Sequence, residues 1–529
     1  MTLLLKSYDT GPFLRSSPSG DTLLPTRPLK ALPFDRVTPE GLLEVRALHR
    51  HIVGVVDFRN RTSAGRSKAG VPLYLFHPVD PGYPPFIVGS RVKPEENWFC
   101  TAEFVSWDAG HEWPRGAIQE RLGPVGDGLT ERKAVVLATG AGALAPETAV
   151  EVRQAVNLAA YKDEPWDAVF HVDPAGCEDV DDVLAYRDEA DGSRTWLIGI
   201  ADVAAWVPEG SPLDAGALRR AQTLYDDGAA IVPMLPHILS TRLASLRSDG
   251  VRRPVVGLRV VCPPRAAAAV VGELGLYQVA VGKTYSYDSV VGTEDGRRVA
   301  ELSAALGAAS DDSHVWIETV MVAYNTHVAA RLKACGHGLL RRLPASEAPP
   351  YKELAATTGC ADLAHLGSQA GEYCAASVDG DVSHSGLGVV VYCHASSPLR
   401  RYADLVNQRV LHSLLQGTLL PAPVSPAYLN HRAAVLRRAE RDLWFLDHIL
   451  RGDWISETEG ILLEGGESCR VYCPAWKRVL RAKAPESEGP VGARGLVRLF
   501  VDRARPQMAR RTVCSFASAS ASKTATDPI

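Results

Sequence analysis

The sequence predicts an α+β protein in which a central region of strands and helices lies between two regions rich in short β-strands. Short β-type runs separated by glycine and proline occupy residues 52–127 and recur after Gly452. Two other segments, 313–335 and 432–451, have apolar residues at helical spacing. A strand–loop–strand unit at residues 168–186 carries a high density of carboxylates.

The composition is that of an ordinary globular protein that is long enough for several domains. Of the 529 residues, 46% are hydrophobic and 22% are charged, and the formal net charge is −4. This balance gives no bulk signal for nucleic acid, although paired arginines provide local basic patches at residues 341–342, 400–401, 437–438 and 510–511. No apolar stretch reaches the length of a membrane span, and the ten cysteines form no CxxC pair. These features predict a soluble cytoplasmic protein with reduced thiols and no membrane partner.

The first 165 residues predict an extension, a barrel and a connector. Residues 1–48 are rich in Pro, Ser, Thr and Leu and have no sustained periodicity, as in an N-terminal extension. Residues 49–130 hold about five short strands with glycine- and proline-rich turns, which suits an OB-type barrel. Residues 131–165 indicate a connector with one helix at 147–161.

The central region, residues 166–455, is organised around an acidic loop between two predicted strands. Four aspartates lie in this loop: Asp173, Asp179, Asp181 and Asp182. Burying such carboxylates unpaired would cost roughly several kcal/mol, a cost that a divalent cation removes. Oxygen-ligated Mg²⁺ or Mn²⁺ suits an all-aspartate cluster better than Zn²⁺ does. A solvated acidic loop is the alternative, and the loop alone leaves both interpretations open.

Two helices are predicted after this loop. Ser211 and Pro212 have the composition of a helix start, and the apolar face that follows is expected to deliver Tyr225 at the helix end. The segment 313–335 is apolar nearly all round and is followed by Gly336, so it predicts a buried helix.

Two more helices are predicted near the end of this region. Ser397-Pro398 is expected to begin a helix that ends at Gly417. Arg400 would then lie in the first turn, where backbone N–H groups favour an anion. The helix at 432–451 leaves Glu440 at the edge of its apolar stripe.

The last part of the chain predicts a further β region and a tail. Four β-type runs occur within residues 456–514, at 460–463, 469–473, 478–484 and 496–501. Residues 515–529 are rich in Ser and Ala and are expected to be disordered.

Four stretches, in order, resemble the ribonuclease II / ribonuclease R (RNB) family of 3′→5′ exoribonucleases. The acidic loop has the pattern Asp-Pro-x-Gly-x-x-Asp-x-Asp-Asp, and residues 197–214 resemble the second core strand of that family and the helix after it. Residues 232–246 begin with Val-Pro-Met-Leu-Pro, and residues 386–409 include His-Ala-Ser-Ser-Pro-Leu-Arg-Arg-Tyr. The matches extend over residues 50–450.

The resemblance implies a fold and a metal. It implies an RNB-type catalytic domain, a mixed β-sheet with helices, that is flanked by OB-type β-barrels. The barrel before it would be cold-shock-like, and the one at residues 456–514 would be short. The four loop aspartates would bind Mg²⁺, with Mn²⁺ as a substitute, and Asp181 would also orient the attacking water.

The resemblance also implies residues that contact RNA. Arg400 would clamp the scissile phosphate in two-pronged fashion, the alternative being an exposed arginine at a helix end. Arg401 beside it would be the more structural of the pair. Glu440 would lie near the reacting end of the RNA, Tyr225 would stack on the terminal base and Glu318 would lie near the terminal ribose. The family's second base-clamping aromatic is not located, because residues 293–312 do not align.

The implied function is a magnesium-dependent, processive exoribonuclease that converts single-stranded RNA to nucleoside 5′-monophosphates. It would act as a monomer or within an RNA-degradation assembly. The alternative is a catalytically weak or inactive RNB-fold protein that binds RNA as a regulator or scaffold. The presence of all four aspartates favours the enzyme.

Overall fold

The computed structural model of this chain separates into two compact units. One unit holds Met1–Gly142, Ala348–Ser368 and Val435–Ile529, and the other holds Ala143–Glu347 and Gln369–Ala434. The structure describes residues 51–60, 64–80, 82–108, 110–140, 156–264, 268–345, 351–367, 370–466, 468–483, 489–503, 505 and 512–518, with short N-terminal pieces at 3–4, 13–15, 22–24, 32, 36–37 and 43–44. Most of the predicted extension at 1–48, and of the helix predicted at 147–161, lies outside these residues.

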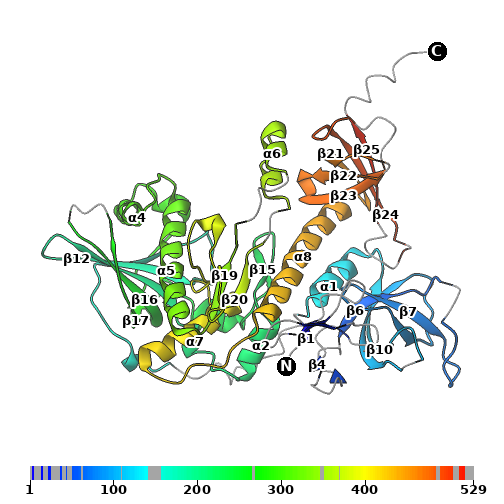
Figure 1. Ribbon diagram of the computed structural model, residues 1–529, viewed down its shortest axis with the longest axis horizontal. Helices are drawn as coiled ribbons and strands as arrows, with labels where there is room; N and C mark the ends of the chain where they lie inside the picture. Colours follow the sequence, from blue (N-terminus) through cyan, green and yellow to red (C-terminus); the bar gives the residue numbers. More distant parts are fainter. Residues whose placement is uncertain are drawn as a thin grey trace, which may run out of the picture. The chain divides into compact units, whose positions relative to one another are not determined.

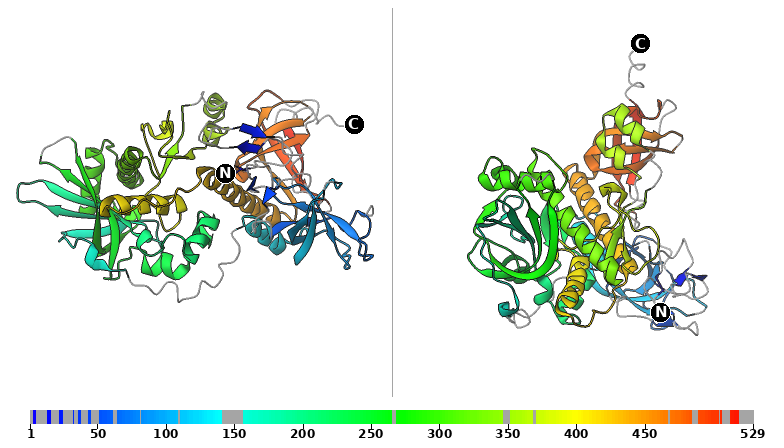
Figure 2. Two further views of the ribbon diagram at one scale, coloured as in Figure 1. Left: turned by 60° about the horizontal axis from the view of Figure 1, so that its bottom comes forward. Right: turned by 60° about the vertical axis from the view of Figure 1, so that its left-hand side comes forward.

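The unit that holds the acidic loop is built on a six-stranded mixed sheet (Figures 1 and 2). Its strands, in spatial order, are β17 (Val270–Ala280), β16 (Arg252–Cys262), β13 (Arg194–Ala201), β12 (Asp182–Asp188), β11 (Ala168–Val172) and β18 (Lys283–Tyr285). All neighbours are antiparallel except β11 and β18, which run parallel. Strand β13 is buried almost throughout because successive residues such as Leu197 and Ile198 pack on opposite faces.

Helices cover both faces of this sheet. Helices α4 (Glu294–Ala305) and α5 (Ser313–Cys335) pack on the face that carries Ile198. Both helices can be followed beside the sheet in Figure 1. Helices α2 (Pro212–Arg220) and α7 (Tyr402–Gln416), with the π-helical turn η6 (Leu239–Leu243), pack on the opposite face. Smaller elements complete the unit: η4 (Leu158–Ala160), η5 (Val203–Ala205), α3 (Tyr287–Val290), β19 (Leu339–Arg342), β20 (Glu372–Ala375) and η8 (Ser385–Leu387).

The predicted start of α2 is confirmed, and so are both predicted ends of α5. The Ser211 hydroxyl accepts the N–H of Asp214, and Pro212 occupies the first turn of α2. Helix α5 has the predicted bounds and ends at Gly336, whose φ of 68° lies in the left-handed region.

The predicted end of α2 and the predicted start of α7 are both wrong, for one shared reason. Helix α2 ends at Arg220, so Tyr225 lies on the short strand β14 (Leu224–Asp226), which pairs with β15 (Ala229–Val232). Helix α7 begins only at Tyr402, so Arg400 lies in the turn before it. The two segments bond to each other, because Tyr402 N–H donates to Ala221 and Thr223 N–H donates to the Arg400 carbonyl. That pairing takes backbone groups that a longer helix would have used.

The other unit contains two closed five-stranded barrels. The first has β6 (Ile52–Val56), β7 (Leu73–Pro78), β8 (Phe86–Gly89), β9 (Trp98–Ser106) and β10 (Arg115–Pro124), close to the predicted strands, and is followed by helix α1 (Gly128–Ala138). The second has β21 (Ile455–Glu464), β22 (Ser468–Cys473), β23 (Arg478–Lys483), β24 (Arg494–Val501) and β25 (Thr512–Ser518). Elements α6 (Lys352–Thr358), η7 (Ala361–His365) and η9 (Pro474–Trp476) also belong to this unit, as does α8 (Pro426–Arg451) from Val435 onward.

The tail prediction is wrong for residues 515–518. They form most of β25, which pairs antiparallel with β24 and parallel with β23 and so closes the second barrel. Alternate residues of β25, including Cys514 and Phe516, are buried in the barrel core. Residues 519–529 lie outside the described part of the chain. None of the helices that the structure describes is both long enough and apolar enough to cross a membrane.

Candidate active site

The acidic loop forms part of the wall of a cavity of about 900 Å³. The paired antiparallel strands β11 and β12 lead into and out of the loop. The chain turns within the loop at Gly176, which has a φ of 83°. Eight of the nine predicted site residues line this cavity: Asp173, Asp179, Asp181, Asp182, Tyr225, Glu318, Arg400 and Arg401. Residues far apart in the sequence are therefore gathered around one space.

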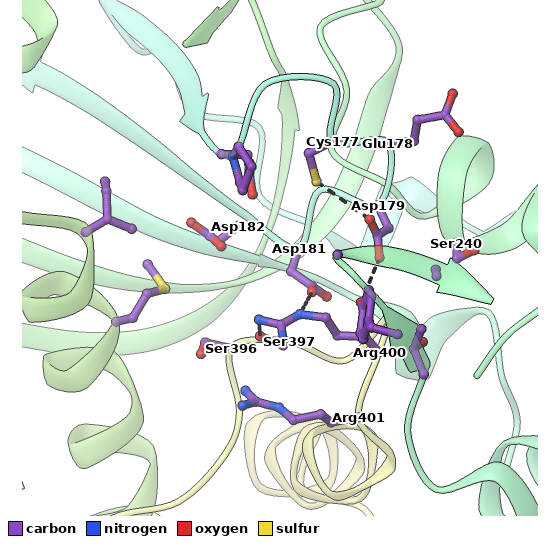
Figure 3. Close-up of a pocket in the computed structure, with 18 of the residues that line it drawn as sticks. Cys177, Glu178, Asp179, Asp181, Asp182, Ser240, Ser396, Ser397, Arg400 and Arg401 are labelled. Atoms are coloured by element: carbon purple, nitrogen blue, oxygen red, sulfur yellow. Dashed lines mark hydrogen bonds and ion pairs between the residues drawn. The ribbon is translucent and has the colours of Figure 1, made fainter. Parts of the chain in front are cut away.

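Asp181 is the carboxylate that ties the loop to the segment before α7. It is 4% exposed. Its Oδ1 accepts the Leu399 N–H at 2.8 Å and its Oδ2 accepts the Arg400 Nε–H at 3.2 Å, as Figure 3 shows for the arginine. Burial raises the pKa of Asp181 to about 7, although Arg400 and the Leu399 N–H oppose that rise.

Arg400 forms hydrogen bonds from only part of its guanidinium group. Its Nη2 donates to the Ser397 hydroxyl at 2.9 Å, and its side chain remains 43% exposed. Among the described residues, Nη1 of Arg400 has no hydrogen-bond partner. The guanidinium can therefore accept a further anion from the cavity without releasing Asp181.

The remaining loop aspartates have different surroundings. Asp173 Oδ2 bonds His171 Nδ1 at 2.8 Å, and Asp179 Oδ2 accepts the Tyr225 hydroxyl at 3.4 Å. Among the residues that the structure describes, none forms a hydrogen bond or an ion pair with the carboxylate of Asp182, whose backbone lies in the β12–β13 ladder. Burial, followed by the negative charges of Asp173 and Asp181, raises the pKa of Asp182 well above its usual range.

The donor set fits a hard divalent cation. The loop offers only carboxylate oxygens, and the charge of Arg400 only partly offsets the burial and the negative neighbours of Asp182. In the described part of the chain, however, no group of three or more His, Cys, Asp or Glu side chains is arranged to hold an ion. Three of the four carboxylates have hydrogen-bond partners of their own within the protein. The ligand assignment of the four aspartates stays a prediction.

Three predicted RNA-contacting residues line the cavity from different elements. Tyr225 extends from β14, and its pKa is raised by burial and by the charge of Asp179. Glu318 is an exposed carboxylate on α5. Arg401 donates from Nε and Nη2 to the fully buried Asp404, both at 2.9 Å. Although burial works to lower the pKa of Arg401, Asp404 raises it overall. Arg401 is therefore bound within the protein.

Glu440 belongs to a different unit from the residues of the cavity. It lies on α8, in the part of that helix that is grouped with the barrels. Its predicted role near the reacting end of RNA stays a prediction.

The structure adds an aromatic pair that the sequence did not reveal. Tyr287 on α3 and His314 on α5 stack with ring centroids 3.9 Å apart and an interplanar angle of 16°. Both line the cavity. The segment 293–312, which did not align, contains helix α4 and carries no residue of the cavity wall. A tyrosine in a four-residue helix has no periodic signal, so only the tertiary structure identifies this pair.

Comparisons with known proteins agree with this architecture. The RNB domain family matches residues 162–269 and 283–417, and the Dis3-like cold-shock domain 2 family matches residues 73–140. Exoribonuclease 2 of Serratia proteamaculans is 28% identical over 360 residues, which cover 54% of this chain and 54% of that protein. Exoribonuclease 2 of Edwardsiella piscicida is 28% identical over 362 residues, again 54% of each. The match thus spans about half the length of these curated relatives.

Solved structures share the fold at low sequence identity. The apo form of Mycoplasma genitalium RNase R superposes with a TM-score of 0.70 at 17% identity, covering 98% of this chain and 100% of that one. Yeast Ssd1, described as a pseudonuclease, superposes with a TM-score of 0.64 at 16% identity, covering 88% of this chain and 70% of that one. From the two domain matches, the motif order and the shared architecture, the chain belongs to the RNB family.

Proposed function

We propose that this protein is a magnesium-dependent, processive 3′→5′ exoribonuclease that hydrolyses single-stranded RNA to nucleoside 5′-monophosphates. The observation that carries the proposal is the contact of buried Asp181 with Arg400, 219 residues further along the chain, inside one cavity with Asp173, Asp179 and Asp182. Relatives named Exoribonuclease 2 support it, as does the fold shared with an RNase R solved with ribose-methylated single-stranded RNA.

The residues divide the work of phosphodiester hydrolysis between them. A divalent ion held by the four aspartates would supply positive charge to the pentacovalent transition state. The free Nη1 of Arg400 would bind a phosphate oxygen. Each oxygen of Asp181 accepts one hydrogen bond and keeps a second lone pair, so the carboxylate can also orient the attacking water.

Other cavity residues would position the end of the RNA. Tyr225 offers a ring face to the terminal base, and the stacked pair of Tyr287 and His314 offers a second aromatic surface. The exposed Glu318 can accept a hydrogen bond from the 2′-hydroxyl of a ribose, which is the group that distinguishes RNA from DNA. We also propose that the protein is cytoplasmic and acts as a monomer or within an RNA-degradation assembly.

A second candidate function is binding of RNA without cleavage, as a regulator or scaffold. The fold shared with the pseudonuclease Ssd1 favours it. The four loop aspartates and Arg400 all line one cavity in this chain, which favours the enzyme.

A single assay separates these functions. An oligoribonucleotide labelled at its 5′ end is incubated with the protein, with Mg²⁺ or with excess chelator, beside a DNA oligonucleotide of the same sequence. We expect stepwise shortening of the labelled RNA only with Mg²⁺, and persistence of long substrate alongside end product when unlabelled RNA is added as a trap. RNA that is bound but uncut would support the regulator, and internal cuts would indicate an endonuclease.

A further inference from the structure

His171 is a buried histidine whose two ring nitrogens are both engaged at the edge of the acidic loop. It is 4% exposed and lies on β11, two residues before Asp173. Its Nδ1 lies 2.8 Å from Asp173 Oδ2, and its Nε2 lies 3.0 Å from the Thr284 hydroxyl. Strand β18 places Thr284 directly opposite His171 in the parallel ladder.

The same strand also holds the backbone of the aspartate. The Asp173 N–H donates to the Tyr285 carbonyl at 3.1 Å. One carboxylate oxygen of Asp173 is thus committed to His171, while the residue lines the cavity and its side chain is 17% exposed. The backbone and one oxygen are fixed, and Oδ1 is left without a partner among the described residues.

Repulsion among the loop carboxylates is the reason why Asp173 needs a group that holds its side chain. The charges of Asp173 and Asp181 both act on Asp182, so each of these two carboxylates lies close enough to Asp182 to repel it. A free Asp173 side chain would turn away from its neighbours. The bond to His171 holds it against that repulsion, and Thr284 holds the ring in turn.

We propose that His171 is a positioning residue that orients the Asp173 carboxylate for a divalent cation, with Thr284 as its anchor. The inference rests on the proposed function for the identity of the cation. Because Asp173 is a pure acceptor when ionised, Nδ1 must carry a proton and donate. The Thr284 hydroxyl can accept from Nε2 or donate to it, so the ring stays anchored whether or not Nε2 carries a proton. The role is therefore one of geometry.

Substitutions at His171 separate the two nitrogens. The amide nitrogen of His171→Asn can occupy the place of Nδ1, whereas that of His171→Gln can occupy the place of Nε2. His171→Phe keeps a ring in the buried site and loses both hydrogen bonds. Thr284→Val removes only the anchor at an exposed edge position. A matched control is His412→Phe, because His412 Nε2 bonds buried Asp202 at 2.7 Å and neither residue lines the cavity.

The measurement is Mn²⁺ binding to the full chain without RNA, read from the electron paramagnetic resonance signal of free Mn²⁺. Loss of a group that orients a ligand weakens metal binding by roughly 10-fold or more. We expect that loss in His171→Phe and His171→Gln, a smaller one in His171→Asn and Thr284→Val, and none in His412→Phe. Thermal melting shows that each variant is folded.

The outcomes keep this inference apart from the proposed function. Wild type that cuts RNA while His171→Phe binds Mn²⁺ as tightly as wild type would overturn the inference alone. The expected ranking in a protein that cuts no RNA would leave the inference standing and overturn the exoribonuclease. If His171→Phe does not fold, equal Mn²⁺ binding by the Asn, Gln and Thr284→Val variants and wild type overturns it. Wild type that binds no Mn²⁺ does the same.

Discussion

Two sets of aspartates in the same unit differ in how their charge is balanced. Asp202, Asp214 and Asp404 are nearly or fully buried and each has a cationic or hydroxyl partner. Asp404 has Arg401, Asp214 has Arg409 at 2.8 Å and Tyr402 at 2.6 Å, and Asp202 has His412 and Tyr161. We call these the compensated aspartates.

The loop aspartates are balanced less completely. The carboxylate of Asp182 has no hydrogen bond or ion pair among the described residues, and Asp181 pairs with a single, partly exposed arginine. Burial raises the pKa of both carboxylates. Three buried aspartates of this unit thus have close partners, whereas two aspartates beside the cavity have few. The cavity can therefore bind a cation that balances their charge. If the loop serves catalysis and the compensated set serves stability, substitutions in the two sets should have different effects.

The largest effect is expected at Asp181. Asp181→Asn keeps the shape and can still accept the Leu399 N–H, but it removes a charge from the site. RNA binding should survive while turnover falls by orders of magnitude, as single-turnover kinetics and filter binding would measure. Undiminished turnover would remove Asp181 from the mechanism.

Arg401 should matter for folding. Arg401→Ala leaves Asp404 buried and uncompensated, and breaking a buried pair in this way costs about 3–5 kcal/mol. Urea unfolding should show this loss directly. An Arg401→Ala protein as stable as wild type would mean that Arg401 is not the structural member of the pair.

Arg400 should matter for rate instead. Arg400→Ala should lower kcat by roughly 10²–10³-fold, the effect of removing one preorganised donor to a transition state. Arg400→Lys should remain impaired because it keeps the charge but loses the planar fork that reaches Asp181 and Ser397 together. Its unfolding free energy should change little, since the side chain is 43% exposed. Wild-type rates in either variant would contradict the assignment.

A smaller effect is expected at Tyr225. Loss of base stacking in Tyr225→Ala should weaken binding of the RNA end by ~1–3 kcal/mol and lengthen the final undegraded fragment. Tyr225→Phe is the control, because it keeps the ring and removes only the hydroxyl near Asp179. End products of equal length in all three proteins would make Tyr225 a packing residue.

The smallest effect concerns pH and the compensated set. Burial favours neutral His412, but the hydrogen bond and charge of Asp202 raise the pKa of His412 overall. This stabilisation is fully present below the ordinary histidine pKa of about 6.5 and is lost as the pH rises through the higher folded value. The difference in melting temperature between wild type and His412→Gln should therefore be larger at pH 5.5 than at pH 9. A constant difference would show that His412 is neutral throughout.

The sequence by itself determined the elements whose signals are local. The acidic loop lies between strands β11 and β12 as predicted, and α5 has the predicted bounds. These succeed because turn residues, the apolar content of a helix and a terminal glycine act over a few residues. The motif order also identified the RNB family and the flanking barrels.

Only the tertiary structure decided the features that depend on distant partners. Arg400 lies outside α7 because Thr223 and Asp181 take up the backbone groups around it. Strand β25 forms from a serine- and alanine-rich segment because β23 and β24 supply its hydrogen bonds and the barrel core buries Phe516. The pairing of His171 with Thr284 across 113 residues is of the same kind. Hydrogen bonds and burial between remote segments outweigh local propensity, and a single sequence carries no local signal of where they will form.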